Sequence, residues 1–233
     1  EFYSNIFLLF YLSYPYLIGH GFFNTTDTPF QFVWILSSYI SIKIFLDVYA
    51  KKDIPFLNIF FLSFTTALLI SIRISGILIL LQYLICFTIT SRSINESLYK
   101  IIKLYLPKIL FFIFFTNIFI FLFYPLFWKN PLLILDSINY LRDIPYGVCT
   151  LTLGRCMDAL NLPSSYILVW LFFKLPILVF IGLILFPFVE KKILINPQHQ
   201  IILGTILLTV ASIIFLLIFF EANLYDELRH ILY

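Results

Sequence analysis

The side chains best suited to chemistry gather in residues 19–30, which read Gly-His-Gly-Phe-Phe-Asn-Thr-Thr-Asp-Thr-Pro-Phe. His20 and Asp27 are titratable, and Asn24 can both donate and accept hydrogen bonds. The stretch lies between two apolar runs long enough to cross a bilayer, and its phenylalanines are expected to hold it at the hydrocarbon boundary. An ionisable residue kept close to lipid is costly, so these residues are functional candidates. The alternative is a solvated turn in which Asp27 caps the next helix, with Pro29 in its first turn.

Arginines on one side of the predicted membrane form a second group of candidates. An arginine can hold a phosphate or a carboxylate with two parallel hydrogen bonds, which a lysine cannot do. Arg73 and Arg229 each lie where an apolar run meets the expected outer face, with few acids next to them in the sequence. We expect both to bind an anionic group such as a lipid phosphate, whereas Arg142 and Arg155 are expected to pair with neighbouring acids. A divalent cation, Mg²⁺ or Mn²⁺, held by Asp27 would serve the same phosphate.

Composition requires that these groups be positioned by helices inside a lipid bilayer. The chain of 233 residues is 62% hydrophobic and 12% charged, contains 29 Phe and has a mean hydropathy of +1.02. A soluble domain of this size could not bury so much apolar surface. The formal net charge of +3 is small and gives no indication of a nucleic-acid partner. Because the chain begins and ends inside apolar runs, we expect an internal piece of a longer protein.

The apolar runs predict an all-α polytopic membrane protein, with residues 1–233 as a single, partial transmembrane domain of about seven transmembrane helices. The spans are expected at residues 2–18, 29–48, 56–72, from the turn at 73–76 to 90, and at 109–127, 166–189 and 200–220. That turn, with Arg73 and Gly76, divides a run too long for one crossing. Residues 91–108 are expected to form a cytoplasmic interfacial helix, because their apolar residues recur at helical spacing. Residues 128–165 are expected to form an outer, periplasmic loop with short helices.

Lysine and arginine counts orient the predicted helices. The side richer in these residues is expected to be cytoplasmic. It would carry Lys43, Lys51, Lys52, Arg92, Lys100, Lys103, Lys108, Lys191 and Lys192. The opposite side would carry Arg73, Lys129, Arg142, Arg155 and Arg229. This orientation places His20, Asp27, Arg73 and Arg229 together on the outer face.

Two further features leave alternatives open. Lys174 and Pro176 lie inside the sixth span, where they would mark the binding site of a transporter or flippase, unless the lysine only reaches back to the interface. Cys149 and Cys156 lie close together in the outer loop and could form a disulfide in an oxidising compartment, whereas Cys86 is expected to be an inert packing residue.

Four segments, in order along nearly the whole chain, resemble motifs of bacterial membrane glycosyltransferases related to protein O-mannosyltransferases. Residues 19–30 are similar to the second outer-loop motif, and residues 71–76 to a short arginine-containing turn between two spans. Residues 128–131 together with 162–176 resemble the long outer loop and the helix after it. Residues 225–230 resemble a Tyr-Asp-x-x-Arg-His segment, although Glu227 stands where a small residue is expected.

The resemblance implies a type-C glycosyltransferase fold with its active site at the outer face. Such enzymes transfer a sugar from a polyprenyl-phosphate carrier to a protein or glycan acceptor, in the cell inner membrane or, in a eukaryote, the endoplasmic reticulum membrane. The site then faces the periplasm or the lumen. The main catalytic acid of the family lies in a first outer loop upstream of these residues, so Asp27 would be the second acid, oriented by His20. Carrier or acceptor would contact Asn24, Arg73, Tyr225, Asp226, Arg229 and His230.

Overall fold

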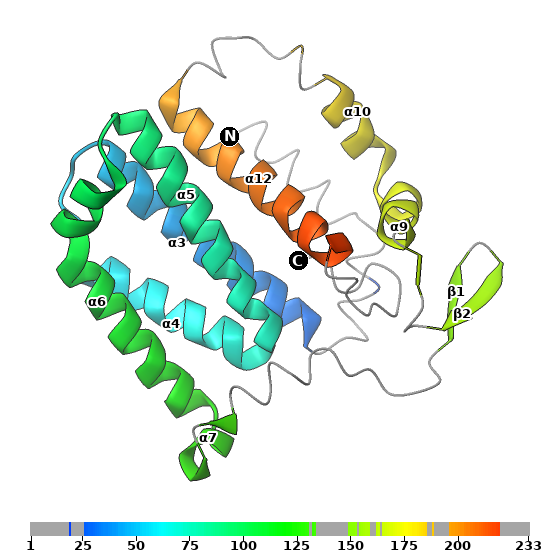
Figure 1. Cartoon of the computed structure of the whole chain (residues 1–233), viewed down its shortest axis with the longest axis horizontal. Helices are drawn as coiled ribbons and strands as arrows, with labels where there is room; N and C mark the ends of the chain where they lie inside the picture. Colours follow the sequence, from blue (N-terminus) through cyan, green and yellow to red (C-terminus); the bar gives the residue numbers. More distant parts are fainter. Residues whose placement is uncertain are drawn as a thin grey trace.

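The computed structural model describes residues 19, 26–130, 132–133, 149–152, 154–158, 162–163, 165–185, 188 and 196–219, and these are mostly helical (Figure 1). The long helices are α3 (Asp27–Tyr49), α4 (Phe56–Ile72), α5 (Ile79–Ile94), α6 (Leu98–Phe123) and α12 (Pro197–Phe219), with the 3₁₀ helix η1 (Ile74–Leu78) between α4 and α5. Shorter elements are α7 (Leu126–Lys129), α9 (Tyr166–Lys174), α10 (Ile177–Leu185) and the strands β1 (Cys149–Thr152) and β2 (Arg155–Asp158).

The lengths and composition of these helices indicate an integral membrane protein. In the described part of the chain, four segments are long and apolar enough to cross a membrane: α3, η1 with α5, α6 and α12. The bent pair of α9 and α10 raises the number to five, and α4 is a shorter apolar helix. The structure therefore supports a polytopic helical protein. The predicted first span at residues 2–18 lies outside the described residues.

The bundle has two ends, which we name by one residue each. The Asp27 end holds the start of α3, the end of α4 and the ends of α6 and α12. The Lys51 end holds the turn between α3 and α4, the turn between α5 and α6, and the start of α12. Helix α4 runs antiparallel to α3 and α5, and α12 lies beside α5 (Figure 1).

A ladder of phenylalanine rings joins α4 to α6. Phe56, Phe60 and Phe64 recur every fourth residue, so they lie on one face of α4. Edge-to-face ring pairs with centroids 5.2–5.5 Å apart link Phe56 to Phe111, Phe60 to Phe115 and Phe119, and Phe64 to Phe119 and Phe123. This is the arrangement that the ring quadrupole favours. Because both series of residues increase together, α4 and α6 run parallel.

Hydroxyl side chains fill the interface between α3, α4 and α5. Hydrogen bonds join Ser37 Oγ to Thr65 Oγ1 (2.8 Å), Thr66 Oγ1 to Tyr83 Oη (2.8 Å), and Ser38 Oγ to Gln82 Oε1 (3.0 Å). In lipid there is no hydrophobic driving force between helices, so small and polar residues that permit close approach and hydrogen bonding hold them together.

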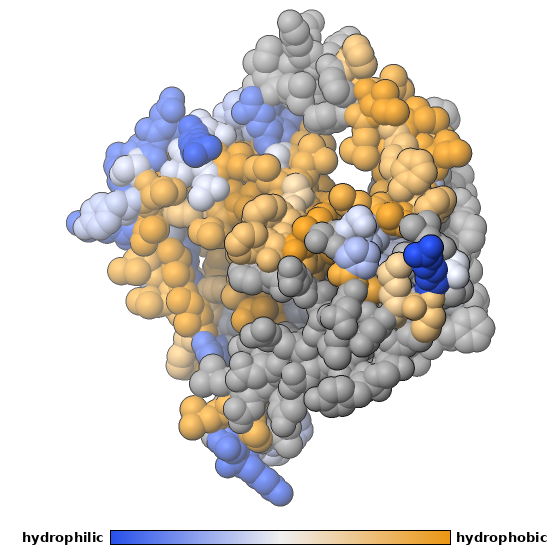
Figure 2. All heavy atoms as spheres, turned by 45° about the vertical axis from the view of Figure 1, so that its right-hand side comes forward, coloured by the Kyte–Doolittle hydropathy of each residue, from blue (hydrophilic) through white to orange (hydrophobic). Residues whose placement is uncertain are grey.

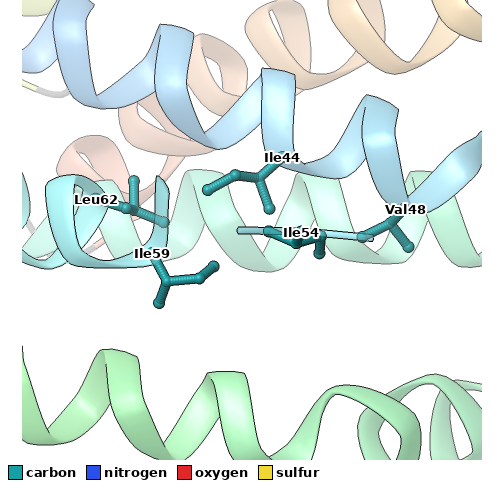
Figure 3. Packing of buried hydrophobic residues seen from close by; sticks show 5 residues of the cluster. All are labelled: Ile44, Val48, Ile54, Ile59 and Leu62. Atoms are coloured by element: carbon teal, nitrogen blue, oxygen red, sulfur yellow. The ribbon is translucent and has the colours of Figure 1, made fainter. Parts of the chain in front are cut away.

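An apolar cluster closes the Lys51 end. Figure 3 shows Ile44 and Val48 of α3, Ile54 of the connector and Leu62 of α4 close together, with Ile59 of α4 on the side toward α6. All five are at most 7% exposed. The short connector therefore contributes a core residue of its own, which fixes the distance between the two helix ends.

Some predicted elements differ from the structure. No separate surface helix occupies residues 91–108: α5 continues to Ile94, and α6 begins at Leu98 and passes through Pro107 without interruption. A proline is tolerated there because neighbouring groups in a membrane bundle can satisfy the backbone. The sixth span is not one helix, because α9 and α10 meet at an angle of 103° around Pro176, which lacks the N–H that would continue the helix. The short helix expected after Pro131 lies largely outside the described residues.

A β-hairpin, which the sequence analysis did not predict, lies within the expected outer loop. Strands β1 and β2 pair antiparallel, with Cys149 opposite Asp158 and Leu151 opposite Cys156. Gly154, with φ of +75°, occupies the turn, where a left-handed conformation suits glycine. The register places positions 149 and 156 on the same face of the ribbon. Cys156 is disulfide-bonded and Cys86 is a free, buried thiol; the pairing of Cys149 with Cys156 stays a prediction.

The sidedness of the bundle can be tested with engineered thiols. Lys129 at the Asp27 end and Lys52 at the Lys51 end are both exposed. If the Asp27 end faces outward, Lys129→Cys should react with a membrane-impermeant maleimide in whole cells, while Lys52→Cys should react only after permeabilisation. The opposite pattern would reverse the orientation and move Asp27 to the cytoplasmic face.

The disulfide can be tested by peptide mapping. Trypsin cleaves after Arg155, which lies between Cys149 and Cys156, so a disulfide between them should hold two tryptic peptides together until it is reduced. Mass spectrometry of an unreduced digest should therefore detect the linked pair. Recovery of either cysteine as a free thiol in most molecules would contradict the pairing.

Candidate functional site

The described part of the candidate site is an ion pair at the Asp27 end. Arg73 Nη1 donates a hydrogen bond to Asp27 Oδ1 at 2.5 Å, across 46 positions of sequence. The side chain of Asp27 is 6% exposed and that of Arg73 is 21% exposed. Thr26 Oγ1 lies 3.5 Å from the same carboxylate oxygen. The pair is thus largely removed from water, where charges attract more strongly but also cost more to desolvate.

The backbone at the end of α4 places Arg73 beside Asp27. Arg73 leaves the helical conformation, with φ of −148° and ψ of 134°, while its N–H still bonds to the Leu69 carbonyl at 3.1 Å. The chain then turns at once into η1, where the Gly76 N–H donates to the Arg73 carbonyl at 2.8 Å. A Cβ at position 76 would lie 2.7 Å from the Leu69 carbonyl oxygen. Glycine is therefore required for the close approach that places Arg73 beside α3.

An apolar cluster lies directly below the ion pair. It consists of Phe30 and Val33 of α3, Leu69 of α4 and Ile79 of α5. Phe30 is 1% exposed, so it packs inside the bundle and not at the hydrocarbon boundary, where the sequence analysis placed it. The first turn of α3 and the last turn of α4 are thereby held together by packing as well as by charge.

Asp27 is not the N-cap residue of α3 but its first helical residue. The N-cap position is held by Thr26, whose side chain makes no capping hydrogen bond. The carboxylate of Asp27 instead pairs with Arg73. Arg73 was a candidate because few acids lie near it in the sequence. The fold nevertheless brings it an acid from another helix. Both residues were sequence candidates, and the expected approach of one to the other is present.

The other sequence candidates lie outside the described residues: His20, Asn24, Tyr225, Asp226, Arg229 and His230. One group close in sequence to Arg73 was not named as a site residue. The Ser71 hydroxyl is buried and has no hydrogen-bond partner among the described residues. An unpaired buried hydroxyl is unfavourable, so a ligand that accepts its hydrogen bond would gain from it.

Among the described residues, no group of three or more His, Cys, Asp or Glu side chains gathers around the ion pair. A groove of about 680 Å³ lies along the lipid-facing side of α6, lined by apolar residues and Asn117. Its lining includes neither Asp27 nor Arg73.

Comparisons with known proteins identify no relative. No protein-family model matches the chain, and no curated protein or solved structure matches it. The class that the fold defines is therefore a polytopic helical membrane protein with a buried carboxylate–guanidinium pair at one end of the bundle.

Gly76 offers a test of how the site is positioned. Gly76→Ala should displace the turn after α4, because its Cβ would meet backbone atoms of Leu69 at 2.7 and 2.8 Å. Overpacking of this kind costs about 1–3 kcal/mol, so the thermal midpoint of the detergent-solubilised protein should fall. Gly182→Ala in α10 is the matched control, because nothing lies within 4 Å of its Cβ. Equal midpoints for the two variants would contradict this account of the turn.

Proposed function

We propose that this chain belongs to a membrane glycosyltransferase that moves a sugar from a polyprenyl-phosphate carrier to a protein or glycan acceptor at the outer face. The observation that carries the proposal is the buried pair of Asp27 and Arg73 at one end of a transmembrane bundle. It supplies a carboxylate and a guanidinium, the two groups that this reaction needs, at the end of the bundle where we expect the lipid-linked phosphate to bind. The motif resemblance is the second support.

The chemistry assigns each group a distinct task. The acceptor hydroxyl attacks the anomeric carbon, the bond from that carbon to the phosphate oxygen breaks, and the electron pair leaves with the phosphate. Arg73 would stabilise the charge that develops on the phosphate oxygens, an effect that is strong where water is excluded. Asp27 would orient the acceptor or accept its proton, whereas the first outer loop of the family supplies the main base. No step is assigned to a metal ion.

The ion pair also implies an order of events. In the structure the charge of Arg73 is balanced by Asp27, so an incoming phosphate must compete with that carboxylate for the guanidinium. Binding of the donor would loosen Asp27 from Arg73 and make the carboxylate available to the acceptor. Donor binding would then precede activation of the acceptor.

A transporter or flippase is the second candidate, and a specific observation favours it. The break between α9 and α10 interrupts an apolar span, and Lys174 lies at the break with its ammonium 5.3 Å from the centroid of the Trp170 ring. Broken helices near the middle of the membrane are typical of substrate sites in transporters. This candidate requires Lys174, and not the Asp27–Arg73 pair, to govern activity.

Activity measurements on site variants distinguish the two candidates. Asp27→Asn retains size but loses charge, and Arg73→Lys retains charge but loses the planar, two-pronged donor. In the intact enzyme each should reduce sugar transfer about 10²–10³-fold, the usual cost of one transition-state contact. Arg73→Lys should also weaken binding of the lipid-linked donor. Transfer is measured with a radiolabelled polyprenyl-phosphate sugar at matched expression.

Control variants show whether a loss of transfer is specific to the ion pair. Lys129→Gln removes an exposed charge from the same end of the bundle and should leave transfer unchanged. Lys174→Gln should also retain transfer if the protein is a transferase. Normal transfer by both site variants would contradict the proposal, and loss of substrate movement in Lys174→Gln alone would favour the transporter.

A further inference from the structure

Exposed basic residues crowd the Lys51 end of the bundle, far from the ion pair. We call Lys51, Lys52, Arg92, Lys100 and Lys103 the basic collar; all five are exposed. They come from the turn after α3, the last turn of α5 and the first turns of α6. These segments lie side by side, because Lys108 of α6 bonds to Asp53 of the α3–α4 turn at 2.6 Å and the charge of Lys51 acts on Glu96.

Of the two acids that the structure describes in these turns, only Glu96 pairs with a member of the collar. Asp53 pairs with Lys108, and the hydrogen bond and charge of that lysine lower the pKa of Asp53. Glu96 pairs with Lys100 at 2.7 Å, and that hydrogen bond lowers the pKa of Glu96. Both acids are therefore ionised, and their charges are balanced by Lys108 and Lys100.

The rest of the collar keeps its positive charge. Among the residues that the structure describes, no ion pair is made by Lys51, Lys52, Arg92 or Lys103. The surface at this end is thus positive, and several of its charged groups are available to an anionic partner.

The backbone at Lys51 is unusual for a lysine. Lys51 has φ of +53° and follows the C-cap of α3, where its N–H bonds to the Val48 carbonyl and the Lys52 N–H bonds to the Asp47 carbonyl. This is the Schellman arrangement, in which glycine is the usual residue because a Cβ is disfavoured at positive φ. A lysine at this position accepts a conformational cost while presenting a charge at the helix end.

Exposed apolar side chains of α6 lie next to the collar. Leu98, Tyr99, Ile102 and Leu104 of the first turns of α6 are 41–75% exposed, next to Lys100 and Lys103 in sequence. Figure 2 shows hydrophilic residues gathered at one corner of the molecule and apolar surface beside them. Apolar residues that enter the acyl region while basic residues remain at headgroup level are the pattern of an interfacial segment.

We propose that the basic collar is a binding surface for anionic phospholipid headgroups in the leaflet at the Lys51 end. Ammonium and guanidinium groups pair with the headgroup phosphates, and the exposed apolar residues of α6 contact the acyl chains. Each basic residue near such a surface contributes about fivefold in affinity, and the effect is screened by salt. This surface is independent of the proposed sugar transfer.

The test compares lipid binding by collar variants of the full chain in neutral detergent. Phosphatidylglycerol should raise the thermal midpoint of the wild-type protein, and phosphatidylcholine should not. Lys51→Gly removes the charge while relaxing the backbone, so this variant should stay folded and bind phosphatidylglycerol about fivefold more weakly. The double variant Lys52→Gln/Lys103→Gln should bind about 25-fold more weakly.

A variant at the opposite end of the bundle and a high-salt measurement serve as controls. Lys129→Gln, at the opposite end, should retain the wild-type response to phosphatidylglycerol. For the wild-type protein, 1 M salt should abolish most of that response, because the Debye length falls to about 3 Å. The same response to phosphatidylcholine as to phosphatidylglycerol would overturn the proposal. Unchanged phosphatidylglycerol affinity in both collar variants would also overturn it.

Discussion

The ion pair between Asp27 and Arg73 connects the first residue of α3 to the residue that follows α4, 46 positions later. A carboxylate or a guanidinium left alone at this depth would be strongly unfavourable, so each residue makes the other tolerable. This mutual dependence requires α4 to end where it does and requires the turn at Gly76 to be tight. The cluster of Phe30, Val33, Leu69 and Ile79 then fixes the distance between the helices from below.

Elsewhere in the bundle, other interactions hold the helices together in lipid. Hydroxyl groups hydrogen-bond across α3, α4 and α5, and phenylalanine rings interlock between α4 and α6. The two ends consequently differ in character. The Asp27 end buries opposite charges together, whereas the Lys51 end exposes an excess of basic residues. This asymmetry fits both proposals, a lipid-linked phosphate bound at the Asp27 end and anionic headgroups bound at the Lys51 end.

Much of the helix content could be predicted from the sequence, because charged and polar residues bound the apolar runs. The prediction for residues 56–72 coincides with α4, and residues 29–48 and 200–220 differ from α3 and α12 by a few positions. The hairpin was missed, although Thr150 and Thr152, which favour strands, followed by Gly154 were a signal. The sequence could not predict that the helix bends at Pro176 but continues through Pro107, because a proline in a membrane helix is compatible with both outcomes. The partner of Arg73 could not be read from its neighbours, because the fold supplies it from another helix.

The most direct test of this account is a double-mutant cycle on the ion pair, with Asp27→Asn, Arg73→Gln and the double variant, read as unfolding free energies in detergent. If the two side chains form one coupled unit, each single variant is destabilised because it leaves an unpaired buried group. The double variant should then be no worse than the less stable single variant, which gives a coupling energy of about 0.5–3 kcal/mol. Additive effects within about 0.5 kcal/mol would show that the residues act separately and would contradict the account.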